Sequence, residues 1–310
     1  MKLDTQLLKD LYMIYHPSGS EHSMLTYIIN YCKSIPNITF ELDHYNNLFI
    51  TKNTNNPETY ACLLAHTDQI TTTKGPYRII EGDDIIYGVH KNDGTRCGLG
   101  CDDSNGICVA LQLLKELPDL KCVFTTDEEL GARGATEACF NTDFLYNVRY
   151  FLQADRRGSS DLITHTNCID TVTEEFLNDL QPIMDKYNYS ENAGTFTDVG
   201  EFVMNLGICG VNISCGYYKE HTVNEHCKKS ELENCLNFIY EILTTLSSDT
   251  QYRIKVKYTS SYDWDWDYEP AKHEAPVEYA EPTHSIDYDK IPCDTCRDMD
   301  CQNCRYMNDF

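Results

Sequence analysis

Short apolar runs alternate along this chain with longer segments whose hydrophobic side chains recur every three or four residues. The short runs predict β-strands at 47–52, 60–65, 121–126, 149–154, 210–215 and 251–258. The longer segments predict helices at 3–15, 21–34, 104–117, 172–187, 198–206 and 229–247. Residues 77–88 predict a hairpin that turns at Gly82-Asp83-Asp84. Strands that alternate with helices indicate an α/β fold, a three-layer sandwich around a mostly parallel sheet.

The segment 121–131, KCVFTTDEELG, places Glu128 and Glu129 directly after an apolar strand. Carboxylates at the end of a buried strand cost free energy unless a partner stabilises them, and a metal ion is the obvious partner. One carboxylate could bind the metal while the other accepts a proton from water. A polar loop with solvated carboxylates is the alternative for this segment alone.

Other polar side chains follow the remaining predicted strands, where open α/β sheets form their sites. These are His66 with Asp68, Asp155 and His221, together with the Asp102-Asp103 pair just before a helix. Each also has a simpler explanation: a satisfied buried histidine, a partner of a neighbouring arginine, a loop histidine or a helix N-cap. Because such groups follow one strand end after another, we favour a joint metal site.

Composition narrows the range of functions. A formal net charge of −24 argues against a nucleic-acid partner, which would need clustered lysine and arginine. No apolar run reaches the ~18 residues of a membrane span, so no membrane association is expected. The N-terminal MKLDTQLLKDLYMIYH predicts an amphipathic helix rather than a signal peptide. Sixteen cysteines without a signal indicate a reducing, cytoplasmic location. Cys62, Cys108, Cys122, Cys209 and Cys215 lie in apolar runs and are expected in the core.

Taken together, the motifs resemble those of the dizinc exopeptidases, which include aminopeptidases of the glutamyl and leucyl type, peptidase T-like tripeptidases and related amidohydrolases. The motifs are HTD, GLGCDDSNG, TTDEELGARGA, FLQAD and CGYYKEHTVNE, in this order. PSGSEHSMLTYI, DHYNNLFITK and NAGTFTDVGEFVMNLGICGVNIS also look like that family, so the resemblance runs from about residue 10 to residue 245. Two departures are Ser104-Asn105 after the aspartate pair and residues 89–97, which look inserted.

The resemblance implies a role for each site residue. His66 and Asp155 would bind a first zinc, Glu129 and His221 a second, and Asp102 would bridge both. Asp68 would orient His66, Glu128 would act as the general base, and Asp103 would follow Asp102, often across a cis peptide. Cobalt or manganese could replace zinc at such nitrogen and oxygen ligands.

The activity implied is cleavage of an amide bond in a short peptide by an aminopeptidase or a di- or tripeptidase. An N-deacylase that acts on N-acyl amino acids is an alternative, as is a non-catalytic homologue that binds metal or peptide. The interval from Asp155 to His221 is too short for an inserted lid domain, so we expect one catalytic domain over residues 1–258. The sequence leaves the oligomeric state open.

The C-terminal region differs in composition. Residues 259–292 are acidic, with prolines and aromatic residues, and predict a linker or tail. Residues 293–310 carry Cys293, Cys296, Cys301 and Cys304 in two CxxC pairs. Such pairs are typical of a structural zinc site, and redox-active or unligated thiols are the alternatives.

Overall fold

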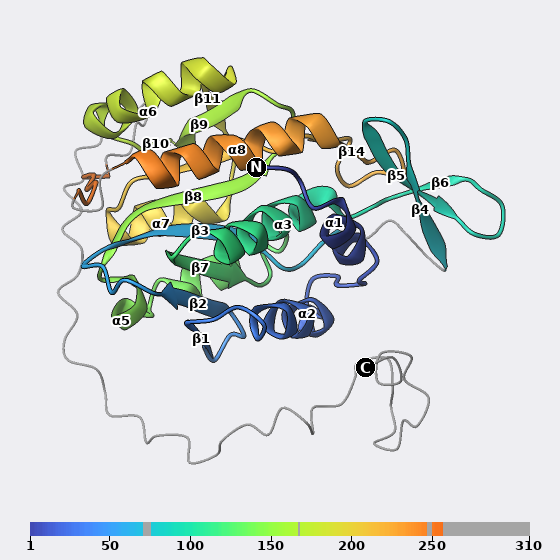
Figure 1. Cartoon of the computed structure of the whole chain (residues 1–310), viewed down its shortest axis with the longest axis horizontal. Helices are drawn as coiled ribbons and strands as arrows, with labels where there is room; N and C mark the ends of the chain where they lie inside the picture. Colours follow the sequence, from blue (N-terminus) through green and yellow to red (C-terminus); the bar gives the residue numbers. More distant parts are fainter. Residues whose placement is uncertain (71–75, 167, 247–249, 257–310) are drawn as a thin grey trace, which may run out of the picture. The chain divides into compact units, whose positions relative to one another are not determined.

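A computed structural model of the chain describes residues 1–70, 76–166, 168–246 and 250–256. Within these ranges the main sheet has nine strands in the order β1-β2-β7-β3-β8-β12-β9-β10, and β11 pairs with β9. Helices cover both faces of this sheet (Figure 1). The predicted α/β sandwich is therefore confirmed.

The elements have the following bounds. The strands of the main sheet are β1 (Ile38–Leu42), β2 (Leu48–Asn53), β3 (Tyr60–His66), β7 (Asp119–Thr125), β8 (Val148–Arg156), β9 (Asp161–Thr166), β10 (Ile169–Asp170), β11 (Ser190–Gly194) and β12 (Gly210–Ser214). A smaller sheet contains β4 (Tyr77–Glu81), β5 (Ile85–His90), β6 (Arg96–Cys97), β13 (Tyr217–Tyr218) and β14 (His226–Lys228). The helices are α1 (Thr5–Tyr12), α2 (His22–Cys32), α3 (Cys101–Glu116), α4 (Arg133–Ala138), α5 (Thr142–Leu145), α6 (Glu174–Tyr187), α7 (Asp198–Leu206) and α8 (Lys229–Thr245).

The centre of the main sheet is parallel, and most of the outer pairs are antiparallel, whereas β11 pairs with β9 in parallel. β3 lies between β7 and β8 and runs parallel to both, with Leu63 opposite Cys122 on one side and Leu152 on the other. β12 is parallel to β8, whereas β2 runs antiparallel to β7. The carboxyl ends of β7, β3, β8 and β12 therefore meet at one edge of the sheet, which is where an α/β fold forms its site.

Alternate side chains of the central strands enter two separate cores. Ala61, Leu63 and Ala65 of β3 pack in a core with α1, α2, α3, α6 and α8. Cys62 and Leu64 of the same strand pack on the opposite face with α4, α5 and α7. This alternation makes the three layers, and it explains why residues 61–65 of β3 are all apolar. The five cysteines expected in the core are all fully buried.

Two parts of the secondary structure differ from the sequence prediction. The strand predicted at 251–258 is wrong for residues 251–256, which form only an isolated bridge between Arg253 and Ile208. The amide of Tyr252 donates to the carbonyl of Arg149, and its carbonyl accepts from the amide of Cys209. Because this segment divides its hydrogen bonds between two neighbours, it forms no continuous ladder.

The hairpin predicted at 77–88 is present as β4 and β5 and belongs to the smaller sheet, which extends away from the main sheet (Figure 1). Residues 89–97, which look inserted in the sequence, complete β5 and return as β6. The sequence prediction also missed edge strands such as β11, SENAG, because a polar and mostly exposed strand has no apolar pattern.

Residues Met1–Tyr258 form one compact unit. The acidic segment and the cysteines at 293, 296, 301 and 304 lie outside the described residues, so their roles stay predictions. Among the helices that the structure describes, none has the length and apolar character needed to cross a membrane.

Candidate active site

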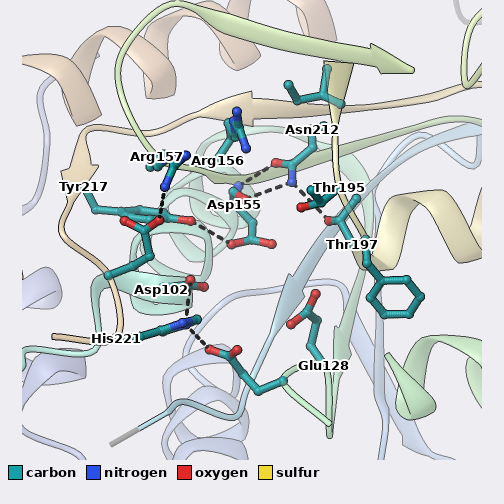
Figure 2. Close-up of a pocket in the computed structure, with 15 residues that line it drawn as sticks. Asp102, Glu128, Asp155, Arg156, Arg157, Thr195, Thr197, Asn212, Tyr217 and His221 are labelled. Atoms are coloured by element: carbon teal, nitrogen blue, oxygen red, sulfur yellow. Dashed lines mark hydrogen bonds and ion pairs between the residues drawn. The ribbon is translucent and has the colours of Figure 1, made fainter. Parts of the chain in front are cut away.

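A cavity of about 400 Å³ opens at the carboxyl edge of the parallel strands (Figure 2). Five of the residues predicted from the sequence line it, namely Asp102, Glu128, Glu129, Asp155 and His221. Another predicted residue, His66, is the last residue of β3 and is buried next to Asp102. The structure thus brings together side chains that lie more than 150 positions apart along the chain. This is expected for residues that follow parallel strands, whose carboxyl ends lie at one edge of the sheet.

Asp102 lies between the two histidines. Its Oδ1 is 2.9 Å from Nε2 of His66, and its Oδ2 is 3.3 Å from Nε2 of His221. Nε2 of His221 is also 2.7 Å from Oε1 of Glu129, and Nε2 of His66 is 3.7 Å from Oδ1 of Asp155. Nε2 of each histidine therefore faces one oxygen of Asp102 and one further carboxylate.

Asp103 is a candidate metal ligand that the sequence analysis did not single out. The peptide bond between Asp102 and Asp103 is cis. Ligand atoms of His66, Asp103 and Asp155 lie within 4.8 Å of one another, as do those of His66, Asp102 and Glu129. Oδ1 of Asp103 accepts a hydrogen bond from the amide of Gly106, whereas its buried Oδ2 has no hydrogen-bond partner among the residues that the structure describes. A buried oxygen without a partner beside two other ligands suits metal coordination.

Asp68 connects two segments of the site, the end of β3 and the residues that follow β7. Its Oδ1 is 3.4 Å from Nδ1 of His66 and accepts a hydrogen bond from the amide of Glu128. Its Oδ2 accepts hydrogen bonds from the amide of Glu129 and the hydroxyl of Ser18. One fully buried carboxylate thus holds both the imidazole at the end of β3 and the backbone of the two glutamates after β7.

The carboxylates shift the pKa values of both histidines upward. Hydrogen bonds to Asp102 and Glu129 raise the pKa of His221 to about 10. Burial acts to lower the pKa of His66, but Asp155 and Asp102 outweigh it, so this pKa also lies well above its ordinary value. For Asp102, burial favours the neutral form, yet hydrogen bonds from His221 and His66 hold its pKa below the usual range. In the absence of a metal, these contacts favour charged histidines on either side of an ionised Asp102.

The charge balance of the cavity fits divalent cations. Burial raises the pKa of Glu128 to about 10, and nearby carboxylates such as Asp155 add to the rise. Burial, with the charge of Asp102, likewise raises the pKa of Asp155. The two arginines of the cavity form ion pairs with carboxylates other than these. Positive charge brought by metal ions would return both groups to their ionised forms.

Glu225 is a further residue whose role sequence reasoning missed, although it ends the motif CGYYKEHTVNE. It is buried, and its carboxylate accepts hydrogen bonds from the amides of Leu99, Gly100 and Cys101 at 2.6, 2.7 and 2.8 Å. These amides directly precede Asp102. Glu225 therefore joins the loop that carries His221 to the segment that leads into α3 and Asp102. Its position in the same motif as His221, a predicted ligand, is the sequence signal that could have identified it.

We expect Glu225→Ala to lower the free energy of unfolding by about 2–5 kcal/mol, because it leaves three amides without their acceptor. Metal affinity should fall as well, since the two segments lose their connection. Glu225→Gln keeps one acceptor oxygen and should lose less on both measures. Urea unfolding and metal titration would check this, with the exposed Glu58→Ala as a control. Unchanged stability and metal affinity in Glu225→Ala would contradict the assignment.

No protein-family model matches the sequence, and no curated protein matches it. Solved structures do resemble the chain. A tripeptidase from Staphylococcus aureus subsp. aureus Mu50 is 15% identical with a TM-score of 0.63, over 77% of this chain and 96% of that one. An aminopeptidase from the archaeon Desulfurococcus kamchatkensis is 15% identical with a TM-score of 0.63, over 79% and 95%. An endoglucanase from Thermotoga maritima is 12% identical with a TM-score of 0.54, over 76% and 96%. The chain thus shares the α/β fold of these structures, and the expected resemblance to the exopeptidases is confirmed at the level of the fold.

Proposed function

We propose that the protein is a metal-dependent hydrolase that cleaves an amide bond in short peptides, as an aminopeptidase or a di- or tripeptidase. The position of Asp102 carries this proposal, because its two oxygens face His66 and His221 separately. A carboxylate between two nitrogen ligands suits a bridge between two metal ions.

The proposed metal ligands fall into two groups around this bridge. His66 and Asp155 would hold one ion, with Asp103 close enough to contribute, and Glu129 with His221 would hold the other. Zinc suits these ligands, and cobalt or manganese would also bind them. Bound there, the pair would polarise the amide carbonyl and acidify a water molecule.

Glu128 is the proposed general base. It lines the same cavity, and its carboxylate accepts no hydrogen bond from the residues that the structure describes. The hydrogen bond from its amide to Asp68 fixes its backbone. The side chain is therefore held in position, although its carboxylate has no hydrogen-bond partner among the described residues. A proton accepted by this carboxylate could be returned to the leaving amine.

Peptides are preferred over other substrates because the tripeptidase and the aminopeptidases share this fold. A glycoside substrate is less suitable, since glycoside hydrolysis generally uses two carboxylates alone. N-acyl amino acids contain the same bond, so an N-deacylase is the second candidate within this proposal. A protein that only binds metal or peptide would not need a carboxylate such as that of Glu128, which accepts no hydrogen bond from the described residues.

Metal removal tests the proposal directly. Treatment with a chelator should abolish hydrolysis of a panel of dipeptides, tripeptides and N-acyl amino acids, and added zinc should restore it. Elemental analysis should find about two zinc ions per chain when Cys293, Cys296, Cys301 and Cys304 are changed to serine. A third ion in the unsubstituted chain would identify a zinc site in the tail. Hydrolysis that persists without metal would contradict the proposal.

A further inference from the structure

Two adjacent arginines line the cavity in a chain with 49 acidic and 25 basic residues. Arg156 and Arg157 directly follow Asp155 at the end of β8. In Figure 2 they lie on the side of Asp155 that faces away from Glu128 and His221. The cavity therefore has a metal-binding end rich in carboxylates and a second end that offers guanidinium groups.

Most hydrogen-bond donors of these two guanidinium groups have no acceptor among the described residues. Arg156 contacts Asp161 only through Nε, at 3.3 Å, and Arg157 contacts Glu220 only through Nη1, at 2.9 Å. Both terminal nitrogens of Arg156 and one of Arg157 have no partner among the described residues. The two side chains are 23% and 62% exposed, so these donors are accessible from the cavity. A guanidinium with free donors binds a carboxylate through two parallel hydrogen bonds.

The backbone that carries the arginines is held in place. Asn212 of β12 accepts a hydrogen bond from the amide of Asp155 and donates one to its carbonyl. The hydroxyl of Ser214 donates to the carbonyl of Arg157, and the carbonyl of Arg156 accepts from the amide of Cys215. Three consecutive residues are thus bonded to β12 or to the residue that follows it. A ligand would not have to order this segment, which favours binding.

We propose that Arg156, assisted by Arg157, binds a carboxylate of the substrate while the scissile amide lies at the metal-binding end. This inference rests on the proposed function and narrows its substrate class to short acyl or peptide amides that carry a carboxylate. The free C-terminus of a di- or tripeptide supplies such a group, and so does an acidic side chain. Because β8 supplies both Asp155 and Arg156 and both residues line the same cavity, a short substrate could reach both ends.

The test compares matched ligands in binding, so that its outcome does not depend on turnover. Alanyl-alanine, alanyl-alanine amide and aspartyl-alanine amide are titrated calorimetrically into the zinc-loaded full chain carrying Glu128→Gln. The same titrations are repeated with Arg156→Gln or Arg157→Gln added. Arg78→Gln, at an exposed position in β4, is the control. Metal content is measured for every variant, because Arg156 adjoins Asp155.

Alanyl-alanine should bind roughly 10–100-fold more tightly than its amide. Arg156→Gln should remove most of that difference, Arg157→Gln should remove less, and Arg78→Gln should preserve it. Tight binding of aspartyl-alanine amide alone would identify the side chain as the source of the carboxylate. Equal binding of all three ligands, or a preference for a carboxylate that survives both arginine substitutions, would overturn the inference.

The two proposals fail in different ways. Hydrolysis by the unsubstituted chain with no carboxylate preference would overturn this inference and leave the proposed function intact. Arginine-dependent binding of the carboxylate without hydrolysis of any tested amide would support the inference and overturn the proposed function.

Discussion

Glu128→Gln should leave metal content and stability unchanged while lowering kcat by roughly 10²–10⁴-fold, as expected when a general base is lost. The substitution keeps the size of the side chain, but an amide cannot accept the proton of the attacking water. The structure supports this separation of roles, because Glu128 lines the cavity without a hydrogen bond to its carboxylate from the described residues. Substrate affinity should change little. Rates measured beside metal content for the same preparation would check it.

Glu129→Gln is the matched comparison, since the two glutamates are adjacent and chemically identical. Oε1 of Glu129 is 2.7 Å from Nε2 of His221, so its loss should weaken the metal at that histidine. Activity should then partly return at high zinc, which it should not do in Glu128→Gln. If Glu128→Gln loses metal and Glu129→Gln does not, the two roles are reversed. Full activity of Glu128→Gln would rule out the mechanism.

Asp102→Ala should lose both metal ions together. One oxygen of Asp102 faces His66 and the other faces His221, so the substitution removes a ligand from both proposed sites at once. The remaining histidines would also lose the carboxylate that holds them in place. Activity should fall below detection, and added zinc should not restore it at concentrations that restore Glu129→Gln. Elemental analysis and zinc titration would measure the loss.

Asp155→Ala provides the control for that prediction. Asp155 is near His66 and contacts neither Glu129 nor His221 through any hydrogen bond or ion pair in the described part of the chain. It should therefore empty chiefly one site and leave about one ion bound. An Asp102→Ala protein that retains both ions would show that Asp102 is not the bridge.

The strands at the centre of the sheet could be predicted from the sequence because they are buried on both faces and therefore carry apolar runs, such as residues 61–65 in β3 and 122–124 in β7. Edge strands could not be predicted in the same way. β11 is polar and mostly exposed, and it exists because it pairs with β9. Segment 251–256 shows the opposite error, since its strand-like sequence lies between two neighbours and forms no ladder with either.

The sequence by itself indicated which residues could form the site, because most of them follow a strand whose carboxyl end must face the same edge, and Asp102 precedes a helix. His66, Asp155 and the two glutamates follow from that rule and from the cost of burying charge. Only the tertiary structure decided how they combine. Asp102 faces both histidines, Glu225 connects two segments, and Arg156 keeps free donors because the chain brings distant segments together. Such contacts depend on distances between side chains, which no local pattern of residues encodes.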